Sequence, residues 1–168
     1  MIQITESNMN FGDFEEDKVF QIENSKLYKN VGNGIKVVEF ILLSKENELS
    51  FIEAKSSSPR PTENSSIRFT EFINEISEKF IHSFNLYYSA ILRRVTDDEG
   101  AEINSRFKKL DNGEIKFKFI LVIKGHKVEW LMPLSDALKK NLAYHNTIWK
   151  SQVVVLNDEQ AKEYRLIK

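Results

Sequence analysis

Two apolar runs joined by a short polar turn place the strongest limit on how this chain folds. The first run, "IKVVEFILLS" at residues 35–44, is nearly continuous in apolar side chains and rich in β-branched residues, as in a strand covered on both faces. The letters "KENE" turn the chain, and the second run, "LSFIEAKS" at residues 49–56, returns beside the first. The sequence therefore predicts a β-hairpin at the centre of a buried sheet.

A long amphipathic segment follows the hairpin. Apolar side chains recur at spacings of three and four residues from Phe69 to Ile91, which predicts a helix over residues 65–94. Leucines at the same spacings predict a second helix over residues 133–149. A serine- and proline-rich loop at residues 56–66 separates the hairpin from the first helix.

Shorter segments complete the predicted architecture. Residues 1–5 and 18–23 resemble short strands, and a long strand is expected after the turn "DNG" at residues 111–113. The apolar segment 151–157 predicts a last strand, followed by a capped short helix. The order of these elements predicts one α/β domain over residues 1–168, with helices on the faces of a mixed sheet and extra strands at the N-terminus.

The composition excludes several classes of protein. The chain has no cysteine, which removes any disulfide framework and any thiolate metal site. Its longest apolar runs are far too short to cross a bilayer, and its N-terminus lacks the basic-then-apolar layout of a signal peptide. We therefore expect a cytoplasmic protein.

Charge is unevenly distributed along the chain, although the formal net charge is only −1. Residues 1–24 hold six acidic residues and one lysine, whereas residues 106–127 hold seven basic and two acidic residues. A basic strand region of this kind suits a phosphate-bearing partner, and an ordinary solvated sheet face is the alternative.

Glu39, Glu53 and Lys55 are the candidate functional residues. Glu53 and Lys55 lie two residues apart in the second strand of the hairpin, so their side chains emerge on the same face. Glu39 lies within the apolar first strand, where burial of a carboxylate is costly unless a cation compensates for it. Two carboxylates on neighbouring strands repel each other, and a hard cation such as Mg²⁺ resolves that conflict. An exposed ion pair between Glu53 and Lys55 is the alternative.

This arrangement resembles the PD-(D/E)xK nuclease superfamily, the fold of many restriction enzymes and DNA-repair nucleases. An acid, a gap of thirteen residues and then Glu-x-Lys lie within residues 35–56, and the long helix that follows fits the family's order. The resemblance implies that Glu39, Glu53 and the backbone carbonyl of Ala54 bind Mg²⁺, or Mn²⁺ in its place. It also implies that Lys55 orients and activates the water that hydrolyses a phosphodiester bond.

Two features depart from the family's pattern. The first acid is Glu39 where the family usually has aspartate, and no proline precedes it. The N-terminal helix that many members carry is not visible before Gly34, since this region resembles strands. That helix would be needed to present Glu23 as an additional ligand.

The register of the hairpin is a further condition for the site. A simple two-residue turn would place Glu39 opposite Ala54, on the wrong face of the sheet. An odd-length loop or a β-bulge would instead pair Ile41 with Glu53 and bring Glu39 opposite Lys55. We therefore expect a bulge or an odd-length loop in this hairpin.

Four basic residues are candidates for contacts with nucleic acid. Arg60 and Arg68 flank the loop that follows Lys55, in a position to hold a phosphate group. Lys116 and Lys118 share one face of a later strand and would add contacts to the phosphate backbone. Solvated loop arginines and a plain polar sheet face are the alternatives.

The resemblance implies a Mg²⁺-dependent nuclease that acts on DNA, as a homodimer or together with another protein subunit. One alternative is a catalytically inactive domain of the same fold that serves as a protein partner. The other is an unrelated interaction module with Glu53 and Lys55 on its surface. The position of Glu39 distinguishes among them, because the nuclease requires its carboxylate near Glu53 and the interaction module has it on the opposite face.

Overall fold

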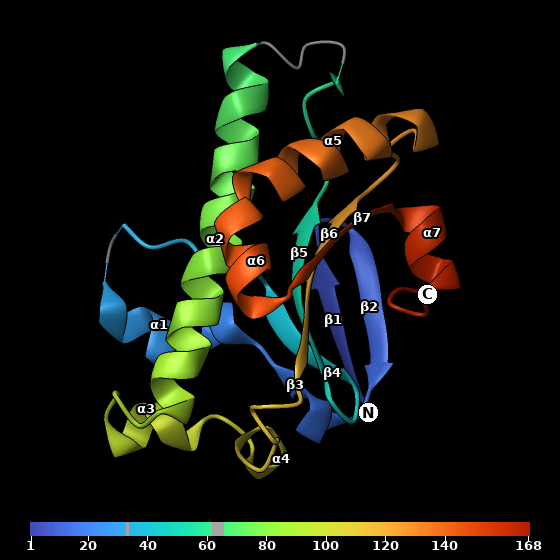
Figure 1. Cartoon of the computed structure of the whole chain (residues 1–168). Coiled ribbons are helices and arrows are strands. Elements are labelled where there is room, and N and C mark those ends of the chain that lie inside the picture. The colour runs from blue at the N-terminus through green and yellow to red at the C-terminus, as the bar shows by residue number, and fades with distance from the viewer. Residues whose placement is uncertain (33, 62–65) are drawn as a thin grey trace.

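A five-stranded mixed sheet forms the centre of the computed structural model, which describes residues 1–32, 34–61 and 66–168 (Figure 1). The strand order is β3-β4-β5-β6-β7; β4 runs antiparallel to β3 and β5, whereas β5, β6 and β7 run parallel. These strands are β3 (Val19–Phe20), β4 (Phe40–Lys45), β5 (Glu48–Lys55), β6 (Lys116–Ile123) and β7 (Gln152–Asn157).

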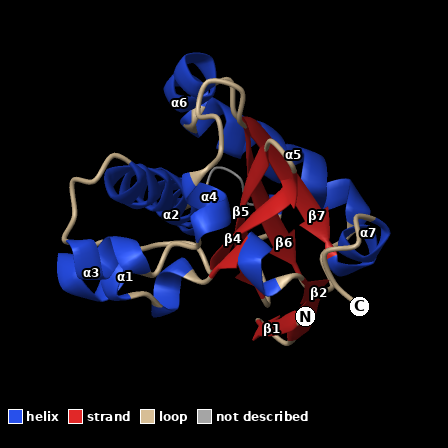
Figure 2. Ribbon diagram, turned by 90° about the horizontal axis from the view of Figure 1, so that it is seen from below, coloured by secondary structure: helices blue, strands red, loops and turns tan. Residues whose placement is uncertain are grey.

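Helices cover one face of this sheet, and a separate β-hairpin with the last helix covers the other (Figure 2). Each face buries its own apolar cluster, so the central strands have no solvent-exposed side, as predicted for the hairpin strands. The helical layer consists of α2 (Ile67–Ile91), α5 (Val128–Asn141) and α6 (Ala143–Trp149), and the opposite layer of β1 (Ile2–Glu6), β2 (Met9–Phe14) and α7 (Asp158–Glu163).

Short helices occupy the connections between these elements. The structure corrects the prediction for the N-terminal region, because the strand expected at residues 18–23 is reduced to β3 and is followed by two helical turns. Ser25 caps the second of these turns by accepting a hydrogen bond from the backbone N–H of Tyr28. The short helices are η1 (Glu16–Lys18), η2 (Ile22–Asn24), α1 (Lys26–Val31), α3 (Asp97–Ala101) and α4 (Ser105–Lys108).

The predicted hairpin is confirmed, but its first strand begins later than expected. β4 begins at Phe40, whereas the apolar run predicted a strand from residue 35. Val37 and Val38 are buried in irregular backbone under α2, where the N–H of Val38 donates a hydrogen bond to the hydroxyl of Ser83. The apolar character of this segment thus reflects packing against a helix rather than strand pairing.

The hairpin contains the expected irregularity in register. The pairing shifts between Leu43 and Lys45, near the turn, which is the position of a β-bulge. Ile41 pairs with Phe51 rather than with Glu53, so the predicted partner was wrong by two residues. A difference of two leaves each side chain on its face, and Ile41 and Phe51 both pack in the cluster beneath α2.

The long helix is confirmed as α2, which begins at Ile67; the predicted start near residue 65 lies outside the described residues. The second helix differs from its prediction, because α5 begins five residues before Pro133 and a break at Leu142 separates it from α6. Burial of Leu131 against the core favours this N-terminal extension. Within the described ranges, no helix is long and apolar enough to cross a membrane.

Candidate metal centre

A cluster of charged side chains lies between the end of β5 and the middle of α2, where it also meets the end of β1 and the short helix η2. Parallel strands β5 and β6 end here, and open α/β sheets usually bind ligands outside such carboxyl ends. The cluster, called the acid–lysine cluster below, comprises Glu6, Glu23, Lys36, Glu39, Glu53, Lys55, Glu75 and Lys79.

Strand β5 presents Glu53 and Lys55 to α2. Because side chains alternate along a strand, these two point to the same face as Phe51, which packs in the cluster beneath the helix. The side chain of Glu53 has no exposed surface, and the Nζ of Lys55 lies 3.4 Å from its Oε1 atom. Glu53 is therefore not part of a surface ion pair, which was the alternative for these residues.

Glu39 lies on the same side of the sheet as Glu53. It directly precedes β4 rather than lying within it, and its side chain is 11% exposed. The Nζ of Lys79 lies 2.7 Å from Oε1 of Glu53 and 4.0 Å from Oε1 of Glu39, so one ammonium group contacts both carboxylates. Glu39 is therefore not on the opposite face, where the unrelated interaction module would have it.

Helix α2 brings two charges to the cluster that complement those of β5. Glu75 and Lys79 lie four residues apart, so they occupy the same side of the helix. Glu75 accepts a hydrogen bond of 2.8 Å from Lys55, while Lys79 donates one of 2.7 Å to Glu53. Each charged group of the strand therefore faces an opposite charge from the helix.

Two further carboxylates reach Glu39 from the N-terminal region. Glu23 lies in η2 and Glu6 ends β1, and single oxygen atoms of Glu6, Glu23 and Glu39 all lie within 4.8 Å of one another. A short helical element thus carries Glu23 to the site, although the sequence pattern showed no helix there. Three carboxylate oxygens at this spacing match the ligand type that Mg²⁺ and Mn²⁺ prefer.

Burial and crowding disfavour the ionised forms of these acids. Burial raises the pKa of Glu39 to about 9, helped by a hydrogen bond with Glu23 and by the charge of Glu53. Burial also raises the pKa of Glu53, while the ammonium groups of Lys79 and Lys55 oppose that rise. Desolvation and the charge of Glu23 raise the pKa of Glu6. Burial is therefore the main cause of the raised pKa of all three acids, and a neighbouring carboxylate adds to the rise for Glu39 and Glu6.

The donor set fits a divalent cation. The second carboxylate oxygen of Glu53, Oε2, is buried and has no hydrogen-bond partner, which is costly for a polar atom unless another group satisfies it. Glu6, Glu23 and Glu39 offer hard oxygen ligands from three separate segments, and the charge of Glu53 acts on Glu39. Oxygen atoms of this kind are the ligands that Mg²⁺ or Mn²⁺ would take.

The carbonyl of Ala54 in β5, the third expected ligand, contacts the turn of the β1–β2 hairpin. It accepts a hydrogen bond of 3.0 Å from the hydroxyl of Ser7. A carbonyl oxygen has two lone pairs, so this bond leaves one of them for another partner.

The four predicted nucleic-acid contacts are divided between two faces of the molecule. Arg68 lines a surface hollow of about 410 Å³ together with Lys55, and Arg60 stacks over the ring of Trp130 at 5.8 Å. Lys118 alternates with the residues beneath α2 and therefore points to the opposite face, where it forms an ion pair with Glu48. Lys116 shares that opposite face, so the structure does not bring either lysine to the acid–lysine cluster.

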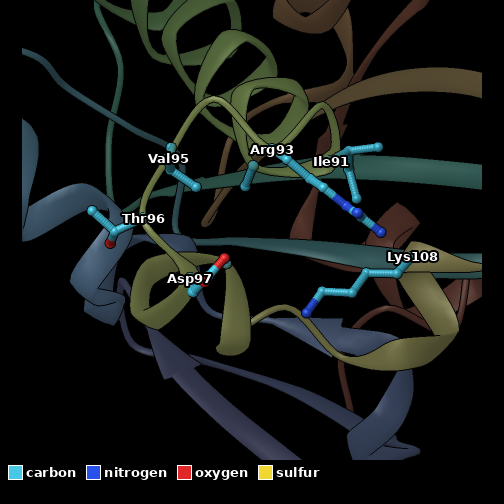
Figure 3. Close-up of a pocket in the computed structure, with 8 residues that line it drawn as sticks. Ile91, Arg93, Val95, Thr96, Asp97 and Lys108 are labelled. Atoms are coloured by element: carbon cyan, nitrogen blue, oxygen red, sulfur yellow. The ribbon is translucent and has the colours of Figure 1, made fainter.

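A second cavity lies at the far end of α2, between its last turn and the short helices α3 and α4 (Figure 3). Its volume is about 390 Å³, and the side chains of Arg93, Asp97 and Lys108 line it. Arg93 and Lys108 are exposed. Exposed side chains of this kind do not form a preorganised site, so the acid–lysine cluster remains the stronger candidate.

Sequence reasoning missed Lys79, Glu75 and Glu6. Lys79 adjoins the apolar stripe of α2 at Ile76 and Phe80 and keeps only 12% of its side chain exposed. A lysine beside such a stripe, four residues after a glutamate, was the available signal. Glu6 gave no signal, because it reaches the cluster only through the fold of the β1–β2 hairpin.

Comparison of the chain with protein-family models, with curated proteins and with solved structures found no match.

Proposed function

We propose that this chain is a divalent-metal-dependent nuclease that hydrolyses phosphodiester bonds of DNA. The observation that carries the proposal is the convergence of Glu39, Glu53 and Lys55 on one face of the sheet, with an unpartnered buried oxygen on Glu53. Metal-dependent hydrolysis of a phosphodiester requires acids that hold a cation and a group that orients the attacking water. The two glutamates and the lysine are residues of these types.

The arrangement of elements supports a restriction-endonuclease-like fold as part of the proposal. Strand β5 of the antiparallel hairpin carries Glu53 and Lys55, Glu39 directly precedes β4, α2 packs across the hairpin, and β6 returns parallel to β5. This is the order in which the PD-(D/E)xK pattern places its hairpin, helix and following strand.

Each residue of the site has a proposed role. Glu39, Glu53 and the carbonyl of Ala54 hold the ion, and Glu23 supports Glu39 through their hydrogen bond. The ion supplies charge neutralisation at the phosphate and lowers the pKa of a bound water molecule. Lys55, with 26% of its side chain exposed, lies at the open side of the site, where it can orient that water toward the phosphate.

The charge balance of the cluster also favours a divalent ion. Among the described residues, the cluster contains five carboxylates and three lysines, so full ionisation would leave two uncompensated negative charges. Burial is the main cause of the raised pKa of Glu39, and the hydrogen bond with Glu23 and the charge of Glu53 add to it. One Mg²⁺ or Mn²⁺ ion supplies the missing charge.

A cleavage assay tests the proposed activity. Purified protein is incubated with plasmid and with single-stranded DNA, in Mg²⁺, in Mn²⁺ and in chelator. We expect cleavage only with metal and its loss in Lys55→Ala, whereas Lys118→Ala, which removes a lysine of the opposite face, retains it. Cleavage in chelator, or a fully active Lys55→Ala protein, would contradict the proposal.

A non-catalytic protein partner is the second candidate, and the ion pairs with α2 favour it. Lys79 and Glu75 already neutralise Glu53 and Lys55 at 2.7 and 2.8 Å, so the site has a stable arrangement without metal. Calorimetric titration with Mn²⁺ separates the two candidates. The nuclease requires binding that disappears in Glu53→Gln, whereas the absence of binding favours the partner role.

A further inference from the structure

We propose that the ammonium group of Lys79 occupies the position of the divalent cation in the resting site, so that the cation binds only when Lys79 withdraws. This inference rests on the metal site of the proposed nuclease and adds a control element that the Glu-x-Lys pattern does not contain. It makes α2 the element that sets how tightly the metal is held.

The contacts of Lys79 are those of a cation between two ligands. Its Nζ atom lies 2.7 Å from Oε1 of Glu53 and 4.0 Å from Oε1 of Glu39. These are the two carboxylates expected to share the ion. Lys55, by contrast, is held 2.8 Å from Glu75 and contacts Glu53 at the longer distance of 3.4 Å.

Burial makes the competition between the two cations strong. The side chain of Lys79 is 12% exposed and that of Glu53 is fully buried, so little water screens their charges. A divalent ion beside Glu53 would therefore be strongly repelled by an ammonium group that stayed within hydrogen-bonding distance of the same carboxylate.

Other carboxylates near Lys79 could accept its ammonium group. Its charge already acts on Glu6 and Glu75, because it lowers the pKa of both carboxyl groups. A lysine side chain has a flexible four-carbon stem, so its ammonium group can move to either carboxylate without a shift of α2. Withdrawal of Lys79 would leave Oε1 of Glu53, next to the unpartnered Oε2, with only the longer contact of 3.4 Å to Lys55.

Calorimetry on the metal-stripped protein tests the proposal with Mn²⁺ as the probe. Lys79→Met keeps the length of the apolar stem and removes the charge, and we expect it to bind Mn²⁺ on the order of tenfold more tightly than the unaltered chain. Lys26→Met is the matched control, because Lys26 contacts Asp98 at 3.1 Å, is 55% exposed and lies outside the acid–lysine cluster. Its Mn²⁺ affinity should change by no more than about twofold, since exposed charges are screened.

Thermal melting gives a second readout that does not depend on activity. In chelator, Lys79→Met should melt below the unaltered chain, because Glu53 loses its partner, and Mn²⁺ should raise its melting temperature more than that of the unaltered chain. If Lys79→Met does not fold without metal, Lys79→Gln replaces it in both measurements, since the amide retains a hydrogen-bond donor for Glu53.

The outcomes separate this inference from the proposed function. If the unaltered chain binds Mn²⁺ and Lys79→Met binds it equally or more weakly, Lys79 is not a competitor, and the nuclease proposal is unaffected. If neither protein binds Mn²⁺, both proposals fail. Binding by Lys79→Met that is tighter than measurable binding by the unaltered chain supports the inference.

Discussion

The ammonium group of Lys79 lies 2.7 Å from a carboxylate oxygen of Glu53, a side chain that has no exposed surface. Ion pairs of this kind do not simply add stability, because both charges lose their hydration when they are buried. Glu53 retains one oxygen without a partner even with Lys79 in place. Lys79 therefore compensates the buried carboxylate of Glu53 only in part, as expected for a site that binds a ligand.

Removal of one partner should be more damaging than removal of both. In chelator, Lys79→Met leaves a buried carboxylate without its cation, and we expect the free energy of unfolding to fall by about 3 kcal/mol. The double variant Lys79→Met/Glu53→Gln should recover most of that loss, because no charge remains to be buried. Urea denaturation of the two variants measures the difference. A double variant as unstable as Lys79→Met would show that packing, not charge, holds this part of α2.

Glu39 should make the metal-free protein less stable as the pH rises. Burial raises the pKa of Glu39 to about 9 from its ordinary 4.5. Between these values the folded chain keeps a proton that the unfolded chain has lost. The stability that Glu39 contributes is therefore complete below pH 4.5 and is lost progressively as the pH rises toward 9.

Glu39→Gln removes this dependence. In chelator, we expect the melting temperature of Glu39→Gln, relative to that of the unaltered chain, to rise between pH 5 and pH 8. The rise should be about 2–4 °C for each kcal/mol of unfolding free energy that the unaltered chain loses over this range. The control Glu71→Gln changes an exposed glutamate of α2 and should follow the unaltered chain at every pH. A constant gap between Glu39→Gln and the unaltered chain would show that the Glu39 carboxyl group titrates alike in the folded and unfolded chains.

The parts of the fold that were predictable depend on local periodicity. The hairpin and α2 follow from apolar spacings of two and of three to four residues, and these spacings also fix Glu53 and Lys55 on one face. The strand predicted at residues 1–5 is confirmed as β1, but its partner β2 was missed because the turn residues Ser7 and Asn8 adopt positive φ angles without a glycine to signal them. Its burial depends on contacts such as that of Phe11 with the sheet, which no local pattern contains.

The site was predictable only where one strand carries its residues. The position of Glu39 depends on the bulge between Leu43 and Lys45. The bulge shifts the pairing of β4 with β5 by one residue and so sets which face each side chain before β4 occupies. Glu6 and Lys79 join the cluster from segments 73 residues apart in sequence. Side chains brought together by tertiary packing leave no spacing rule in the sequence, so the acid–lysine cluster as a whole required the structure.

Arg68 and Lys118 should differ in their effect on DNA binding. Arg68 borders the hollow beside Lys55, whereas Lys118 lies on the other face and is paired with Glu48 at 2.8 Å. With Ca²⁺ in place of Mg²⁺, fluorescence anisotropy should show weaker binding for Arg68→Ala. The slope of log affinity against log salt should become shallower by about 0.9 if one phosphate contact is lost. Lys118→Ala should leave both quantities unchanged, and the reverse result would move the DNA to the opposite face.

Ser83 should connect the stability of α2 to the position of Glu39. Its hydroxyl accepts a hydrogen bond of 2.8 Å from the backbone N–H of Val38, the residue before Glu39, and both residues are fully buried. Ser83→Ala leaves that N–H without a partner, so we expect a loss of about 1–3 kcal/mol in the free energy of unfolding. Because the segment that carries Glu39 is then less firmly held, Mn²⁺ affinity should fall as well.

Ser89→Ala is the matched control in the same helix, since the Ser89 hydroxyl donates to the carbonyl of Leu86 and its removal leaves no donor unpaired. The control should remain within about 0.5 kcal/mol of the unaltered chain. Equal stability of the two variants in urea denaturation would show that the contact between Ser83 and Val38 does not hold this segment in place.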